Sequence, residues 1–291
     1  MRKKWMSTKY LVLFFVLTLA WTWICGLIPV LLGITGTGFG TFIFYFGGGA
    51  PSVVALFLVF LTYPKDKKKD YFIRCFSLRR AGWKWPLITA LVFTILSAIS
   101  IAVGVGILGF EMPTMDYIKA IAANPLNILL VLLLSLISGP LNEEFGWRGY
   151  ALDRLLVRFG FLKGSLVLGF IWAIWHLPWY FTPGQAQYNL LQDSVFHALM
   201  FIPSVMMLSV FVSFVYVKTG RSILAGDLVH MLSNLIGSQL LSSYTTEISM
   251  LIRYMNMAFF LGVIIYVVTS RKFKSETAAV IETIRRQEQE G

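Results

Sequence analysis

The sequence predicts an all-α polytopic membrane protein with eight transmembrane helices and both termini in the cytoplasm. Two observations support this fold class: the apolar composition and the placement of Lys and Arg. Hydrophobic residues make up 57% of the 291 residues, charged residues make up 13%, and the mean hydropathy is +0.73. Soluble domains are usually about 45 to 50% apolar and about 25% charged. A soluble enzyme, a nucleic-acid-binding domain and a disordered scaffold are therefore excluded as descriptions of the whole chain.

Eight apolar runs are long enough to be spans, because a helix of about 20 residues crosses the hydrocarbon core. They cover residues 10–33, 41–63, 85–110, 126–142, 162–181, 197–217, 222–243 and 248–269. The fourth run is short, so its helix is expected to continue through Glu143. The first run follows three cations, as in a signal peptide. Its apolar core is too long for one and no small-residue cleavage site follows, so we expect a retained span.

Lys and Arg concentrate in the cytoplasmic loops of membrane proteins. Of the 25 cations, 23 fall in the amino-terminal arm, in the loops after the second, fourth and sixth runs, or after the eighth run. The exceptions are Lys119 and Arg253, and Arg253 lies near the outer end of the eighth run, where it can reach the surface. Only an even number of spans, with both termini in the cytoplasm, fits this distribution of Lys and Arg. The net charge of +11 thus reports topology, and it gives no support to a nucleic-acid partner.

The expected organisation is one eight-helix transmembrane domain over residues 1–274 and a polar cytoplasmic tail over residues 275–291. We expect the tail to be a short solvated helix or a frayed end. Cys25 lies in an apolar run and Cys75 in a basic segment. Neither a disulfide nor a metal-ligand spacing is expected from them.

Ionisable groups inside spans cost several kcal/mol and are candidates for function. The first cluster contains Glu143, Glu144 and Arg148. Adjacent side chains on a helix point about 100° apart, so the two carboxylates can have different roles. Glu144 and Arg148 are four residues apart and can pair, which leaves Glu143 free to face inward. An interfacial ion pair that closes the helix explains this cluster equally well when it is taken alone.

Two further clusters contain histidine. His176 lies about 20 Å from the cytoplasmic end of its span, and Trp172 is one turn before it. For an isolated span histidine, a hydrogen bond between helices is the simpler explanation. Asp227, His230 and Asn234 have spacings of three and four residues, which place them on one helical face.

Together the clusters supply carboxylates, two imidazoles and an amide to otherwise apolar helices, in what we expect to be the cytoplasmic half. Two imidazoles and a carboxylate bind zinc in many hydrolytic sites. The same groups can activate water through a carboxylate base without a metal. Either chemistry needs a buried, hydrated pocket.

In this order, the clusters resemble the motifs of the CPBP family of intramembrane proteases, the CAAX protease and bacteriocin-processing or Abi family. The family motifs EExxxR, FxxxH and HxxxN are matched by Glu143, Glu144 and Arg148, by His176 with Trp172 in the aromatic position, and by His230 and Asn234. The likeness covers about residues 126–240. The first three spans contribute only their length and topology to this likeness.

The resemblance implies an intramembrane endopeptidase that hydrolyses peptides or membrane-tethered proteins near the cytoplasmic face, with a site open to the cytosol and the lipid. By resemblance, Glu143 is the general base, and Glu144 with Arg148 orients it. His176 and His230 position the water or bind a metal, and Asn234 stabilises the oxyanion. If Zn²⁺ is used, its ligands are Glu143, His176 and His230. A metal-independent glutamate mechanism is the alternative.

Two residues depart from the family pattern. Trp172 is a larger wall than the motif's phenylalanine, and Asp227 is an extra acid that we expect to act as a second partner for His230. The expected partners are a peptide or membrane-protein substrate and the lipid bilayer, in a prokaryotic plasma membrane. The alternative function is a non-catalytic regulatory or immunity protein that binds a membrane partner through the same pocket. A small transporter is less favoured, because no two similar halves are visible.

Overall fold

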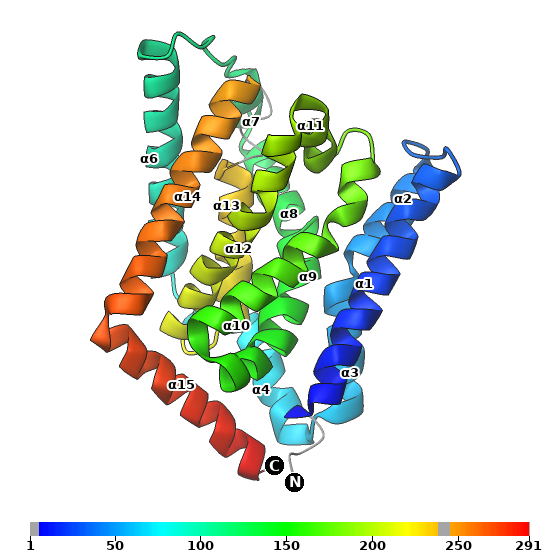
Figure 1. Ribbon diagram of the computed structural model, residues 1–291, viewed down its shortest axis with the longest axis vertical. Helices are drawn as coiled ribbons and strands as arrows, with labels where there is room; N and C mark the ends of the chain where they lie inside the picture. The colour runs from blue at the N-terminus through cyan, green and yellow to red at the C-terminus, as the bar shows by residue number, and fades with distance from the viewer. Residues whose placement is uncertain (1–5, 238–244, 291) are drawn as a thin grey trace.

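The computed structural model describes residues 6–237 and 245–290, and these residues form helices without a strand among them (Figure 1). Five helical segments of this part are long and apolar enough to cross a membrane: α1 (Thr8–Leu31), α6 (Lys84–Gly106), the stretch Pro125–Phe181, α12 (Val195–Lys218) and α14 (Thr246–Thr269). A sixth is formed by α2 (Gly38–Gly48) and α3 (Ala50–Thr62), which are bent by 49° relative to each other. The protein is thus a multi-pass integral membrane protein.

The bend between α2 and α3 follows from the local sequence. Gly47, Gly48 and Gly49 have no side chains to stabilise a helix, and Pro51 near the start of α3 cannot donate a hydrogen bond back to the preceding turn. The glycines also permit close packing, since a Cβ on Gly47 would lie 2.6 Å from the Cβ of Cys25 in α1.

The stretch Pro125–Phe181 contains several elements. In chain order these are α8 (Pro125–Ile137), α9 (Pro140–Gly146), the π-helix η2 (Trp147–Leu152), α10 (Asp153–Trp175) and the 3₁₀-helix η3 (Leu177–Phe181). Within α10, Gly160 has a left-handed φ of 72°, and the chain turns there. Glycine tolerates this conformation without the steric cost that a Cβ would add. The expected span 162–181 therefore begins just after the turn.

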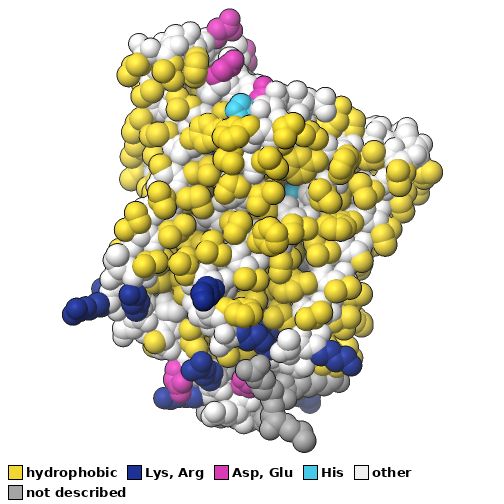
Figure 2. All heavy atoms as spheres, in the orientation of Figure 1, with side chains coloured by type: hydrophobic (Ala, Val, Ile, Leu, Met, Phe, Trp, Pro, Cys, Tyr) yellow, Lys and Arg dark blue, Asp and Glu magenta, His cyan; other side chains and the backbone are white. Residues whose placement is uncertain are grey.

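Short helices lie at both ends of the bundle (Figure 1). The basic end, as we define it, carries the start of α1 together with α4 (Lys65–Phe76), α5 (Leu78–Ala81) and α15 (Arg271–Glu290). The outer end carries α7 (Asp116–Ala122) and α11 (Ala186–Asp193). α13 (Ile223–Gly237) starts at the basic end and is the short apolar helix of the bundle. Figure 2 shows a broad belt of hydrophobic side chains between the ends, with Lys and Arg gathered toward the basic end.

The carboxyl-terminal segment is more ordered than the sequence suggested. Its helix α15 begins at Arg271, and Phe273 and Ile284 are buried against the bundle. Lys218 at the end of α12 forms an ion pair with Glu276 at 2.7 Å. The expected helix is present over the tail, and it is not solvated on all sides, because one face of it is apolar and packs on the membrane domain.

A buried ionic network joins the elements of the basic end. Asp153, at the start of α10, forms ion pairs with Arg221 and with Arg74 of α4, and it accepts a hydrogen bond from the Tyr216 hydroxyl at 2.8 Å. Burial alone would lower the pKa of Arg221, but the adjacent Asp153 carboxylate reverses that effect and raises it. Arg221 therefore stays charged, and the network fixes the end of the chain segment that carries the first two candidate clusters.

Candidate active site

Glu143 is positioned by the contact between α9 and α3. α9 begins at Pro140, where a missing N–H costs nothing because the first turn leaves it unpaired. The Ser52 hydroxyl of α3 donates to the Leu141 carbonyl at 2.9 Å. At Gly146 the helices are so close that a Cβ would lie 2.5 Å from the Pro51 carbonyl oxygen. The first carboxylate cluster is therefore held against α3 by glycine and proline geometry.

Glu144 lies in a buried ionic triad. Its Oε1 accepts a hydrogen bond from Nη1 of Arg148 at 2.7 Å and another from Nδ1 of His230 at 2.9 Å. Glu144 and Arg148 are fully buried, and His230 is nearly so. The expected pairing of Glu144 with Arg148 is confirmed. The contact with His230 comes from the third cluster, 86 residues later in the chain.

Trp172 connects the three clusters. Its indole Nε1 donates to Oε2 of Glu143 at 2.5 Å. The Arg148 guanidinium lies 4.8 Å from its ring centroid, and the His230 ring lies edge-on at 4.9 Å. The sequence suggested that Trp172 forms a wall of the pocket. Its indole is also a hydrogen-bond donor to Glu143, the candidate base. Phenylalanine has no such donor.

His176 ends α10 and lies on the side of Trp172 toward the outer end. Its Nδ1 is 2.9 Å from the carbonyl oxygen of Trp172. A carbonyl can only accept, so Nδ1 carries the proton and Nε2 is left as an acceptor. The ring packs against Trp175, Trp179 and Phe201, with centroid distances of 4.6, 5.4 and 5.1 Å. The histidine is thus bonded within its own helix and not between helices.

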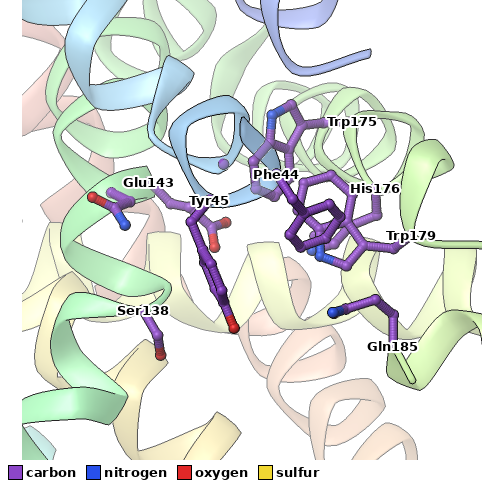
Figure 3. Close-up of a pocket in the computed structure, with 10 residues that line it drawn as sticks. Phe44, Tyr45, Ser138, Glu143, Trp175, His176, Trp179 and Gln185 are labelled. Atoms are coloured by element: carbon purple, nitrogen blue, oxygen red, sulfur yellow. The ribbon is translucent and has the colours of Figure 1, made fainter. Parts of the chain in front are cut away.

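A cavity of about 200 Å³ borders both Glu143 and His176 (Figure 3). Its lining residues are Phe44, Tyr45, Gly48, Ser138, Asn142, Glu143, Trp175, His176, Trp179 and Gln185. Figure 3 shows Tyr45 between Glu143 on one side and the cluster of Phe44, His176 and Trp179 on the other. The residues from α2 and from the segment after α10 were missed at the level of sequence. The only sign of these lining residues in the sequence was the run of glycines at 47–49, which indicates a close approach of backbones.

Asn234 lies beside Glu143. A Cβ on Gly139 would be 3.5 Å from Oε1 of Glu143 and 3.8 Å from Nδ2 of Asn234, so both polar groups face this glycine. All six residues expected from the motifs therefore gather around Glu143 and Trp172. They come from α9, η2, α10 and α13.

Two comparisons with known proteins agree with this arrangement. Residues 125–236 match the family model described as Type II CAAX prenyl endopeptidase Rce1-like, a range that includes the six clustered residues. The chain is also 26% identical over 238 residues to CAAX prenyl protease 2 of Methanococcus maripaludis, which covers 81% of this chain and 87% of that relative.

The chain is therefore similar to the CAAX protease family over these residues. These similarities support a membrane-embedded endopeptidase that acts on a peptide or protein substrate.

Asp227 does not take the role expected for it in this CAAX protease homologue. Its side chain is fully buried, and neither carboxylate oxygen has a hydrogen-bond partner among the described residues. Nδ1 of His230 instead donates to Glu144. The reason is geometric: Glu144 approaches His230 from the neighbouring helix, whereas Asp227 lies one turn earlier on the same helix.

The candidate metal ligands do not converge in this arrangement. Over residues 6–237 and 245–290, no three side chains of His, Cys, Asp or Glu lie close enough together to hold a metal ion. Nδ1 of His176 and Nδ1 of His230 are both engaged in hydrogen bonds, and Glu143 is held by Trp172. The side chains as placed do not form a metal centre, so we derive no step through a metal.

His176, at one edge of the cavity, lies toward the outer end of the bundle. The ring of Phe201, which contacts His176, is six residues from the start of α12 and 17 from its end at Lys218. At 1.5 Å per residue, these separations are about 9 Å and about 25 Å. The expectation of a site in the cytoplasmic half that opens to the cytosol stays a prediction. Because Trp175 is the last residue of α10, His176, which follows it, lies past the middle of the bundle.

Proposed function

We propose that this CAAX protease homologue hydrolyses a peptide bond in its cavity, with Glu143 as the base that activates water. One observation carries the proposal: of the two adjacent carboxylates, only Glu143 borders the cavity. Glu144 is fully buried and is shared by Arg148 and His230. A general base must reach the proton that it removes, and Glu143 alone satisfies this condition.

The proposed reaction uses the groups around Glu143 in turn. Glu143 takes a proton from a water molecule, and the hydroxide oxygen forms a bond to the carbonyl carbon of the substrate. The Asn234 amide N–H donates to the oxyanion that develops. The C–N bond then breaks, and the proton held by Glu143 passes to the leaving amine. Nε2 of His176, the free acceptor, orients the water.

The triad of Glu144, Arg148 and His230 holds the other groups in place. Arg148 neutralises the charge of Glu144 inside the bundle, and His230 is fixed in one tautomer with Nε2 available. Zinc bound by Glu143, His176 and His230 is an alternative that remains a proposal. Metal analysis of the purified protein tests it independently of activity.

We further propose eight spans, with both termini in the cytoplasm of a prokaryotic cell. The stretch Pro125–Phe181 supplies two spans, because the chain turns at Gly160. α2 with α3 supplies one, and α13 completes the number although it has only 15 residues. The segregation of Lys and Arg supports the orientation.

The relative from Methanococcus is named a prenyl protease, so a prenylated peptide with a carboxyl-terminal CAAX sequence is one substrate class to test. Unmodified peptides and segments of membrane proteins are the others. A non-catalytic regulatory protein that binds a partner in the same pocket is the alternative function.

The test is cleavage by purified protein in lipid vesicles, followed by mass spectrometry of the products. We expect Glu143→Gln to lower the cleavage rate by about 100-fold or more while the melting temperature stays near that of the wild type. The matched control is Glu111→Gln, at an exposed position outside the site. Full cleavage by Glu143→Gln would contradict the assigned base. A wild-type protein that cleaves no substrate class but still binds a partner would favour the regulatory alternative.

A further inference from the structure

We infer that Arg221, in the turn between α12 and α13, is a positioning residue that holds α13 at the depth where His230 reaches Glu144. It acts through its ion pair with Asp153 and touches no reacting atom. The inference rests on the proposed function, since it concerns the same site. It adds a residue that the three motifs do not contain, and it gives the buried network at the basic end a part in the reaction.

Two buried ionic contacts tie α13 and the turn before it to the segment that contains η2. At one end, Nδ1 of His230 lies 2.9 Å from Oε1 of Glu144. At the other end, the guanidinium of Arg221 pairs with the carboxylate of Asp153. On each segment the two contacting residues are nine positions apart, and they occur in opposite order along the chain. The two segments therefore run antiparallel and are tied at both ends, so a shift of α13 along its axis strains both contacts.

The helices are closely packed between the two contacts. A Cβ on Gly149 of η2 would lie 3.0 Å from Cδ1 of Ile223, and a Cβ on Gly226 of α13 would lie 3.4 Å from Oε2 of Glu144. Packed helices slide past one another as rigid bodies. A displacement at the start of α13 is therefore passed to His230, about two turns later in the same helix.

The backbone of Arg221 shows that this position is under constraint. Among the described residues it is the non-glycine residue with a left-handed φ, at 71°. A Cβ carries a steric cost in this region, and strained residues cluster where the surrounding structure fixes them for function. Arg221 donates to Asp153 through Nε and Nη2, and its backbone N–H donates to the Tyr216 carbonyl at 2.8 Å. Since the Tyr216 hydroxyl also donates to Asp153, the whole turn is fixed on one carboxylate.

The tail helix completes the coordination of the guanidinium. Nη1 of Arg221 donates to Oε1 of Gln287 in α15 at 2.9 Å. Asp153 has two further partners, because it pairs with Arg74 and accepts from Tyr216. Loss of the Arg221 side chain therefore leaves Asp153 paired, and a variant at position 221 is expected to fold.

The first experiment measures the kinetics of Arg221→Gly in lipid vesicles with a defined peptide. Glycine is relaxed in a left-handed turn, so the substitution removes the pair with Asp153 and adds no strain. We expect kcat to fall about tenfold or more while KM stays within about twofold, because misplaced groups slow the chemical step more than binding. Arg221→Lys retains the charge and should restore part of the rate.

Lys218→Gln is the matched control. It breaks the ion pair of α12 with Glu276 of the tail helix, three residues before Arg221, and leaves the contacts of Asp153 in place. Its kcat should equal that of the wild type. The inference is overturned if Arg221→Gly loses no more kcat than Lys218→Gln does.

The second experiment reads the position of His230 without activity. In protein labelled with ¹⁵N-histidine, the Nδ1 proton resonance of His230 is assigned by its absence in His230→Gln. We expect this resonance to shift or disappear in Arg221→Gly and to stay unchanged in Lys218→Gln. Gln287→Ala, a milder variant, should change both readouts in the same direction and by a smaller amount.

The resonance separates this inference from the proposed function. An unchanged His230 signal in Arg221→Gly overturns the positioning role, whatever the cleavage rate. If the wild-type protein cleaves no peptide, the proposed function fails, and the His230 signal alone decides whether Arg221 positions α13.

Discussion

Glu143 and Glu144 are neighbours in the sequence, and their carboxylates have opposite surroundings. Glu144 is fully buried, and its Oε1 accepts hydrogen bonds from Arg148 and His230. Glu143 borders the cavity and accepts from the indole of Trp172. The angle of about 100° between successive side chains on a helix produces this division. One carboxylate therefore supports the fold while the other faces the cavity.

Glu144→Gln should lower stability as well as activity. The substitution removes the negative charge next to the buried Arg148, and breaking a buried pair from one side costs about 3 to 5 kcal/mol. Thermal unfolding in detergent measures this loss, and Glu143→Gln is the matched control because it leaves the pair intact. Equal melting temperatures for the two variants would contradict the division of roles.

Trp172→Phe should lower the cleavage rate by about tenfold or more while the fold is retained. Phenylalanine keeps an aromatic ring beneath Arg148 but loses the hydrogen bond to Glu143, and such bonds to charged groups contribute about 1.5 to 3 kcal/mol. Steady-state kinetics with a defined peptide give the rate. The control is Trp175→Phe, whose indole donates to the Thr22 hydroxyl at 2.7 Å and does not contact Glu143. A Trp172→Phe variant with wild-type rates would rule out the donor role.

Much of the fold could be predicted from apolar run length. In the described residues the eight runs fall on helical segments, because burial of the backbone in lipid requires helices. Residues 238–243 of the seventh run lie outside the described residues. The break at Gly49 and the turn at Gly160 could not be placed. Both depend on how neighbouring helices pack, and an apolar run looks the same on either side of a break.

The site was predictable only in its local parts. The pair of Glu144 and Arg148 follows from a spacing of four residues on one helix. The contact of Glu144 with His230 joins different helices, so only a family resemblance brought these residues together. The aromatic wall from α2 has no chemical motif, and Phe44 and Tyr45 could not be told from lipid-facing residues. The depth of the cavity depends on helix packing, which could not be read from the length of the apolar runs.

Gly146→Ala should destabilise the protein and displace the site. The added Cβ would lie 2.5 Å from the Pro51 carbonyl oxygen, so α9 must move away from α3. Overpacking of this kind costs about 1 to 3 kcal/mol. Melting temperature and cleavage rate should both fall. Gly262→Ala is the matched control, since its Cβ would meet no atom within 4 Å. Equal effects of the two substitutions would show that the contact of α9 with α3 is not close.

The Cys75 thiol should resist alkylation in the folded protein. Burial raises its pKa well above the usual range, and the thiolate is the reactive form. Raising the pH from about 7 to about 9 therefore accelerates the reaction of the unfolded chain but leaves Cys75 of the folded protein slow. Mass spectrometry after N-ethylmaleimide treatment, with and without dodecyl sulfate, measures both. Rapid labelling of folded Cys75 at pH 8 would show that the α4 contact opens readily.

The distance in sequence between Glu144 and His230 has a consequence for how the enzyme is made. The ribosome delivers Glu143, Arg148 and His176 well before His230, which lies 86 residues after Glu144. A chain interrupted after α12 has Glu143, the proposed base, but lacks His230 and Asn234. On the proposed mechanism, activity is thus assembled only after α13 has been synthesised and inserted. Under that mechanism, a chain that stops before α13 could not cleave nascent membrane proteins beside it.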